Sequence, residues 1–99
     1  ADNFSVRWTG QVQPQFSGVT TFYALADDGV RLWVNNTLLV DRWVNNASES
    51  SGTINLVGGQ KYSIRMEFFE KNNKAEARLS WSHASQPKVV IPQGRLYSQ

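Results

Sequence analysis

The sequence lacks several features on which whole classes of function depend. It has no cysteine, which excludes disulfide bridges and thiolate metal sites but leaves a secreted and a cytosolic setting both open. No apolar run approaches the roughly 20 residues of a transmembrane helix and no signal peptide begins the chain, so we expect no membrane insertion. No two basic residues are adjacent and the net charge is only +2, which argues against nucleic acid as a partner.

Patterns typical of catalysis are missing as well. The single histidine, His83, has serines near it, but the chain has no Gly-x-Ser-x-Gly motif and no evident orienting carboxylate. Asp27 and Asp28 are adjacent, whereas two carboxylates that hydrolyse a glycoside must flank the bond at about 5–10 Å from each other. We therefore do not expect an enzyme.

What the chain does have is a strong alternation of apolar and polar residues, the period of half-buried strands. Ninety-nine residues suffice for one domain, 1–99, with a single core. No helical periodicity is visible. The alternating and apolar runs predict strands at 4–12, 22–26, 30–34, 38–40, 54–56, 62–68, 75–81 and 89–91. The expected fold is all-β, an antiparallel β-sandwich or flattened barrel.

The segments between these runs predict how the strands connect. Residues 44–53 are polar and rich in Asn and Ser, which is typical of a surface loop. The loop at 70–74 is short, so we expect strand 75–81 to pair antiparallel with the long central strand 62–68. Because prolines stand on both sides of 89–91, that strand must lie at a sheet edge or extend without ladder hydrogen bonds.

The phase of the alternation predicts the core. In-phase positions that should be buried are Phe22, Leu32, Val34, Ile64, Met66, Phe68, Leu79 and Trp81. Trp33 is out of phase with Val30, Leu32 and Val34, so its ring should face outward.

The triplet Asp27-Asp28-Gly29, between two apolar runs, is the best candidate for a functional site. Two adjacent carboxylates repel each other unless a cation or hydrogen-bond donors stand between them, and calcium takes 6–8 oxygens of this hard type. The alternative is structural, because Asp before Gly often forms a turn and caps backbone N–H groups.

Six segments, in this order, resemble the PA-14 domain family, named for the protective antigen of anthrax toxin: FSVRWTG, FYALADDGVRLWVN, LLVDRW, YSIRMEFFE, AEARLSW and VVIPQGRLY. The resemblance runs from Phe4 to Tyr97. It implies a β-sandwich module of the kind found in bacterial glycosidases and adhesins and in yeast flocculins, with carbohydrate binding as its usual inferred role. Members usually begin with further strands, so this chain looks short at its N-terminus.

The same resemblance implies calcium as a cofactor. In the calcium-binding adhesins of the family, the paired aspartates act with an asparagine on the loop after the long central strand, and Glu70 stands nearest that place here. The implied metal ligands are Asp27, Asp28 and Glu70, with a cis peptide bond between the two aspartates. An ordinary alternative for Glu70 is pairing with Lys71 or Lys74 on a solvated loop.

The ligand implied is a glycan whose hydroxyls complete the calcium shell. The carbohydrate-binding candidates are Asp27, Asp28, Trp33, Trp43 and Asn73, because an exposed Trp ring can stack on the apolar face of a sugar; core packing is the alternative for both rings. We expect a non-catalytic carbohydrate-binding module within a larger glycosidase or adhesin, secreted or at the cell surface. The competing interpretation is a structural or protein-binding spacer that binds neither sugar nor metal.

Absent N-terminal strands would leave one sheet with an unpaired edge beside residues 4–13. Bare edges recruit other strands unless charge or proline protects them. We therefore expect such protection, or association of that edge with a second copy of the chain or a neighbouring domain.

Overall fold

The fold is an antiparallel β-sandwich, as the alternation predicts. The structure, a computed structural model, describes residues 4–26, 29–42, 48–70 and 77–98. In these residues the elements are β1 (Phe4–Val12), β2 (Gly18–Ala26), β3 (Gly29–Val34), β4 (Thr37–Arg42), β5 (Ser48–Leu56), β6 (Tyr62–Glu70), β7 (Ala77–His83), β8 (Gln86–Val90), the 3-10 turn η1 (Gln93–Arg95) and β9 (Leu96–Ser98). None of their helices has the length and apolarity needed to cross a membrane.

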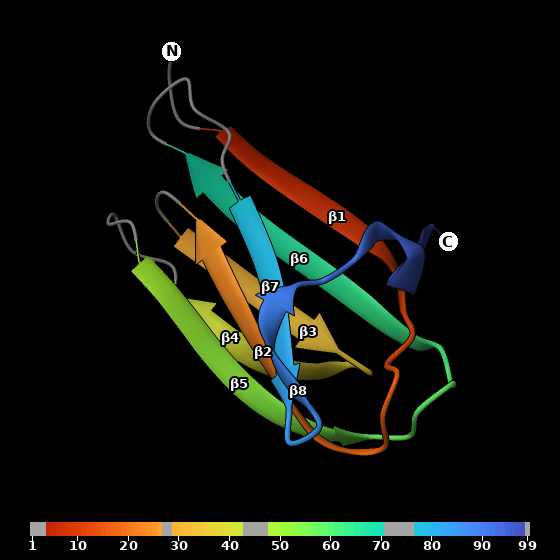
Figure 1. The fold of residues 1–99 in the computed structure, drawn as a ribbon. Coiled ribbons are helices and arrows are strands. Elements are labelled where there is room, and N and C mark those ends of the chain that lie inside the picture. Colours follow the sequence, from red (N-terminus) through yellow and green to blue (C-terminus); the bar gives the residue numbers. More distant parts are fainter. Residues whose placement is uncertain (1–3, 27–28, 43–47, 71–76, 99) are drawn as a thin grey trace.

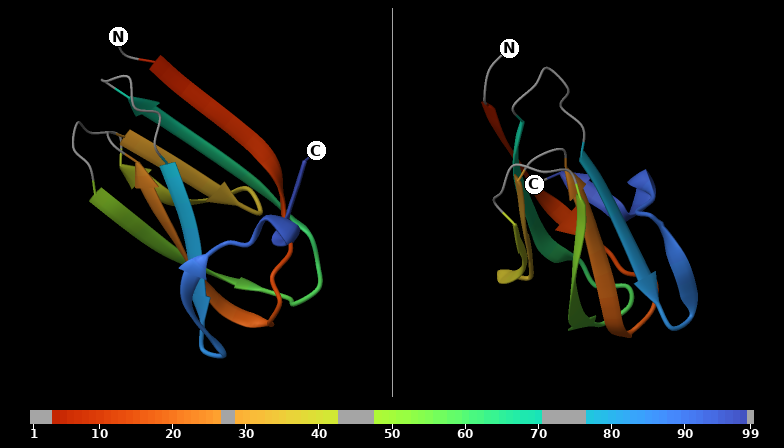
Figure 2. Two further views of the ribbon diagram at one scale, coloured as in Figure 1. Left: turned by 45° about the horizontal axis from the view of Figure 1, so that its top comes forward. Right: turned by 90° about the vertical axis from the view of Figure 1, so that its left-hand side faces the viewer.

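The strands form two sheets that face each other across one core (Figures 1 and 2). One sheet has the order β4-β3-β6-β1-β9 and the other has the order β5-β2-β7-β8. The long strand predicted to be central, β6, is the middle strand of the five-stranded sheet. The β3–β4 hairpin turns at Asn35 and Asn36, whose φ angles of 52° and 62° lie in the left-handed region that asparagine tolerates. β8 lies at a sheet edge, as the prolines on both sides of residues 89–91 predict, and one of these prolines, Pro87, is part of the strand itself.

The expected loop at 44–53 is wrong over its second half, because β5 begins at Ser48 and pairs with β2 along its whole length. The sequence pattern does not reveal the first part of this strand, because its backbone forms the hydrogen bonds with β2 whatever the side chains are, and an edge strand can keep polar side chains. Ser51 and Thr53 are exposed on it. Gly52 has a specific reason to lack a side chain, since a Cβ there would stand 2.4 Å from the carbonyl oxygen of Leu39 on β4.

The expected pairing of β7 with β6 is also wrong. β6 already has β1 on one side and β3 on the other, and β7 lies in the opposite sheet between β2 and β8. The chain therefore changes sheet between Glu70 and Ala77. Alternation specifies which face a side chain takes, but it does not specify which sheet a strand joins, and facing sheets are only about 10 Å apart.

The predicted core is confirmed for most positions. Phe22, Leu32, Val34, Ile64, Met66 and Trp81 are buried, and the rings of Phe22 and Trp81 pack with centroids 6.2 Å apart. Phe68 and Leu79 are half-buried and pack against this cluster. These two stand near the points where β6 ends and β7 begins, so they have core neighbours on fewer sides.

The unpaired edge expected beside β1 is only partly present. β9 pairs with Gly10–Val12 in antiparallel register, whereas residues 4–9 have no second partner strand in the described part of the chain. The two strands approach closely at Gly10, where an added Cβ would stand 2.5 Å from the carbonyl oxygen of Tyr97.

Candidate functional site

Several strands stop or start together at one end of the sandwich, which we call the loop end (Figure 1). At this end β2, β4 and β6 stop, and β3, β5 and β7 begin. Their terminal residues are matched in the register of the two sheets: Ala26 with both Ser48 and Ala77, Gly29 with Phe69, and Val30 with Arg42. The strand ends that border residues 27–28, 43–47 and 71–76 therefore all lie at the loop end.

Most of the predicted site residues belong to those three segments. Asp27, Asp28, Trp43 and Asn73 lie outside the described residues, as does the predicted cis bond. Glu70 is described in its backbone alone, as the last residue of β6, opposite Phe4 on β1. The structure brings the attachment points of these residues together, and the roles of their side chains stay predictions.

Arg42 is a residue at the loop end that sequence reasoning missed. Its Nε donates a hydrogen bond to Ser50 Oγ at 3.1 Å, and its Nη2 donates to the carbonyl oxygen of Ala26 at 3.5 Å. It therefore links β4 to the end of β2 and to β5, and it holds a positive charge beside the residue that precedes Asp27. The order of the segments gives no sign of this, because Ala26 and Arg42 meet only through the pairing of their strands.

Trp33 is not at the loop end. It lies four positions along β3 from Gly29, which is about 13 Å at the usual rise of a strand. As its phase predicts, it is half-buried among the outward-facing side chains rather than in the core. The register between β3 and β4 shifts next to it, between Leu32 and Trp33. Such bulges re-aim neighbouring side chains.

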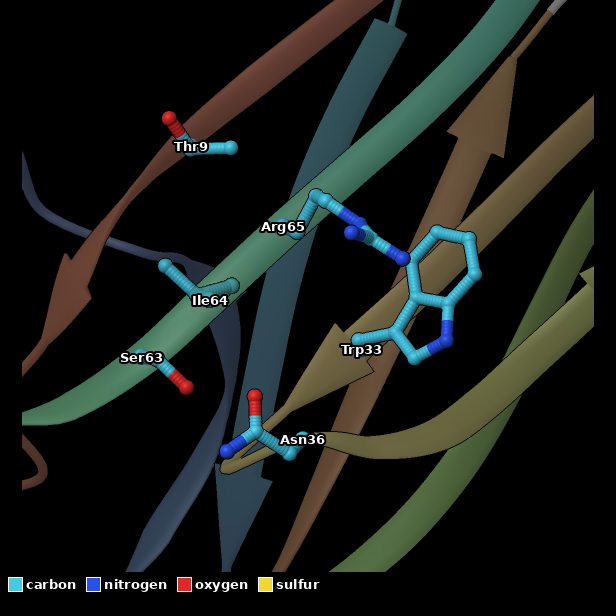
Figure 3. A pocket seen from close by; sticks show the side chains of 6 residues that line it. All are labelled: Thr9, Trp33, Asn36, Ser63, Ile64 and Arg65. Atoms are coloured by element: carbon cyan, nitrogen blue, oxygen red, sulfur yellow. The ribbon is translucent and has the colours of Figure 1, made fainter.

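Around Trp33 the structure forms a pocket of about 350 Å³, which we call the Trp33 pocket (Figure 3). It is lined by Thr9 of β1, Ser63, Ile64 and Arg65 of β6, Trp33 of β3, and Asn36 of the hairpin turn. Thr9, Arg65 and Trp33 form one row across the sheet. Sequence reasoning found only Trp33, because the other members come from strands that are distant in the chain.

A cation lies against the Trp33 ring in this pocket. The guanidinium carbon of Arg65 is 4.0 Å from the ring centroid, and Figure 3 shows the side chain reaching from β6 to the indole. The Nε of Arg65 is also 3.8 Å from Glu67 Oε2, which accepts a hydrogen bond from Arg7 Nε at 3.0 Å. Stacking of this kind is worth about 0.5–1 kcal/mol at an exposed site, so it orients the arginine more than it stabilises the fold.

Comparison with known proteins adds a family and close relatives. A family model described as the PA14 domain matches residues 1–95. The anti-sigma-I factor RsgI3 of Acetivibrio thermocellus is 50% identical over 97 residues, which are 97% of this chain and 15% of that protein. The chain therefore spans a small part of the length of this relative.

Solved structures agree with this assignment. An anti-sigma factor domain-containing protein matches with a TM-score of 0.92 and 38% identity, over 97% of this chain and 34% of that one. A structure described as the PA14 sugar-binding domain from an RTX adhesin matches with a TM-score of 0.80, over 100% of this chain and 56% of that one, and its 20% identity shows a shared fold. PA14 is a binding module, and this chain is not an enzyme, as expected.

Proposed function

Because this chain belongs to the PA14 domain family, we propose that it is a carbohydrate-binding module whose glycan binds at the loop end. The observation that carries the proposal is the convergence there of the strand ends next to Asp27, Asp28, Trp43 and Asn73. A domain of the same fold is described as sugar-binding, which supports a sugar as the class of ligand. Trp43 directly follows Arg42, and we propose that its ring stacks on the sugar.

Calcium is part of this proposal. Asp27, Asp28 and Glu70 offer carboxylate oxygens, the hard donors that calcium prefers. The pairing of Gly29 with Phe69 supports the set, because it puts the backbone of Glu70 beside the strand that follows the two aspartates. We propose that these three residues hold the ion, that Asn73 assists in binding the sugar, and that calcium supplies open coordination positions for sugar hydroxyls.

The relatives also suggest the larger setting. The protein RsgI3 is named an anti-sigma-I factor, and this chain corresponds to 15% of it. We propose that the chain is the ligand-sensing module of a longer anti-sigma-factor protein, exposed outside the cell where polysaccharide is found. This setting is favoured over a glycosidase or an adhesin, because the identities of 50% and 38% belong to proteins named for anti-sigma factors.

A melting experiment tests the metal. We expect millimolar calcium to raise the melting temperature of the wild type above its value in chelator, and Asp28→Asn to abolish the difference. An ion present at 100 times its dissociation constant adds about 2.7 kcal/mol, which is about 10 °C or more for a domain of this size. The matched control is Asp41→Asn, which removes the same charge from a carboxylate paired with Arg31 on the sheet face.

A glycan array, with and without calcium, tests the ligand. Binding that requires calcium and is lost in Asp28→Asn but kept in Asp41→Asn would support the loop end as the site. Equal melting temperatures in calcium and in chelator would exclude calcium binding, and the aspartates would then be residues that form a turn. An array on which no glycan binds would favour the alternative of a structural or protein-binding spacer.

A further inference from the structure

We propose that the Trp33 pocket is a second, calcium-independent binding site, and that it takes an acidic sugar by binding the sugar's carboxylate to Arg65. The site lies on the outer face of the five-stranded sheet, apart from the loop end. It therefore does not depend on the aspartates or on calcium.

The guanidinium of Arg65 is held in place by one aromatic ring and one carboxylate. In the described part of the chain its Nε is buried without a hydrogen-bond partner, and its contacts are the Trp33 ring and the more distant Glu67 carboxylate. A guanidinium carries its N–H groups in its plane, so stacking on a ring face leaves them directed past the rim of the ring. The side chain is 43% exposed, so its outer nitrogens can reach a ligand.

The charge around the pocket favours an anion. Arg7 and Arg65 share a single carboxylate, Glu67, and the shorter contact is the one with Arg7. Two positive groups and one negative group leave one positive charge. A planar carboxylate matches two parallel N–H donors of a guanidinium, and such charge-assisted pairs are about twice as strong as neutral hydrogen bonds.

The rest of the lining suits a polyhydroxylated ligand. Thr9 and Ser63 carry hydroxyls and Asn36 an amide, and each of these groups can donate to and accept from a sugar hydroxyl. Figure 3 shows the Ser63 and Asn36 side chains on the side of the pocket away from Thr9. A volume of about 350 Å³ is at the lower end of small-molecule sites, which fits one sugar unit. Because stacking on Trp33 already fixes Arg65, binding costs little further side-chain order.

The test is a titration of the full chain in chelator, followed by the NMR signals of backbone and Trp indole N–H groups. The probes are sodium galacturonate, galactose, sodium acetate and inorganic phosphate. We expect galacturonate to shift the Trp33 indole signal and the amides of Ser63 and Arg65, and to bind at least about tenfold more tightly than the other three probes. Galactose has the ring without the carboxylate, acetate has the carboxylate without the ring, and phosphate is a tetrahedral anion.

Variants connect this binding to the pocket. Arg65→Gln should weaken galacturonate binding about tenfold or more, because it removes one charge-assisted pair. Arg65→Lys should recover only part of the lost affinity, since it restores the positive charge without the two parallel N–H donors of a guanidinium. Arg78→Gln is the matched control, because it makes the same charge change at an exposed position of the other sheet and should leave the affinity unchanged. Ser63→Ala gives an independent variant that keeps Arg65.

Three results would overturn the proposal. If galactose or phosphate bound as tightly as galacturonate, an acidic sugar would not be the specific ligand. If the affinity for galacturonate were unchanged in Arg65→Gln and in Ser63→Ala, the Trp33 pocket would not be the binding site. If the signal shifts were confined to residues at the loop end, the acidic sugar would bind there instead. Loss of calcium-dependent binding at the loop end leaves this titration unaffected, so the two proposals fail separately.

Discussion

Each sheet carries on its outer face a cation stacked over an aromatic ring, and the two pairs differ in what else the cation binds. On the four-stranded sheet, Lys88 Nζ is 4.5 Å from the centroid of Tyr23 and forms an ion pair of 2.5 Å with Glu49. The Tyr23 hydroxyl shares a hydrogen bond of 2.9 Å with Ser82. Both members of this pair have their polar groups satisfied.

On the five-stranded sheet, Arg65 lies closer to its ring, 4.0 Å from the Trp33 centroid, but among the described residues its Nε has no hydrogen-bond partner. The difference indicates different roles for the same kind of contact. Lys88 belongs to β8 and Glu49 to β5, which are the two edges of their sheet, so this ion pair spans the sheet face. The pair of Arg65 and Trp33 joins adjacent strands that are already hydrogen-bonded, and it leaves donors facing a pocket.

The largest expected effect comes from the core that both faces share. Phe22 is fully buried against Trp81, and Phe22→Ala should cost about 3–5 kcal/mol, a large share of the stability of a small domain. Urea unfolding followed by circular dichroism and by Trp fluorescence should give coincident transitions. Phe68→Ala, at a half-buried position, should cost less. Transitions that separate would mean that the two sheets unfold independently.

A smaller effect should arise where the two sheets meet at their edges. In Gly52→Ala on β5, the new methyl would stand 2.4 Å from the carbonyl oxygen of Leu39 on β4. Relieving such a contact shifts backbone and should cost about 1–3 kcal/mol in the free energy of unfolding. Gly94→Ala is the control, since a Cβ there meets nothing within 4 Å. Equal stabilities of the two variants would show that β4 and β5 move apart without cost.

The smallest effects compare the two cations directly. Lys88→Met should lower stability by about 0.5–1 kcal/mol, because it removes an exposed ion pair and a ring contact. Arg65→Met should lower stability less. It removes the ring contact and a weaker ion pair, but it also removes a buried Nε that has no hydrogen-bond partner among the described residues, and this second change is favourable. Urea denaturation of both variants gives the order. If Arg65→Met were the more damaging change, Arg65 would be a residue that stabilises the fold rather than one that is kept for binding a ligand.

Sequence reasoning succeeded where side-chain chemistry carries the information. Alternation placed Phe22 and Trp81 inside and Trp33 outside, because one face of each strand is buried. It failed for β5, where Ser51, Gly52 and Thr53 give no apolar signal and backbone hydrogen bonds alone form the strand. It also failed for the partner of β7, because period two contains no information about which sheet a strand joins.

The candidate sites divide in the same way. Asp27 and Asp28 stand out in the sequence because two carboxylates side by side need a partner. Arg42 and Arg65 do not stand out, since their significance comes from groups brought to them by strand pairing. Arg42 meets the carbonyl of Ala26, and Arg65 meets the ring of Trp33. Such contacts follow from register, which the sequence pattern alone does not specify.

The pairing of β1 has a consequence for how the chain acquires its structure during synthesis. Of the described strands β1 is made before the others, yet its partners are β6 and β9, through pairs such as Phe4 with Glu70 and Gly10 with Ser98. A chain that emerges N-terminus first must therefore keep β1 unpaired until nearly the whole domain has been translated. Sheets built from such distant segments fold in roughly milliseconds to seconds, much more slowly than helical bundles. During that interval the apolar face of β1 is open to chaperones and to other nascent chains.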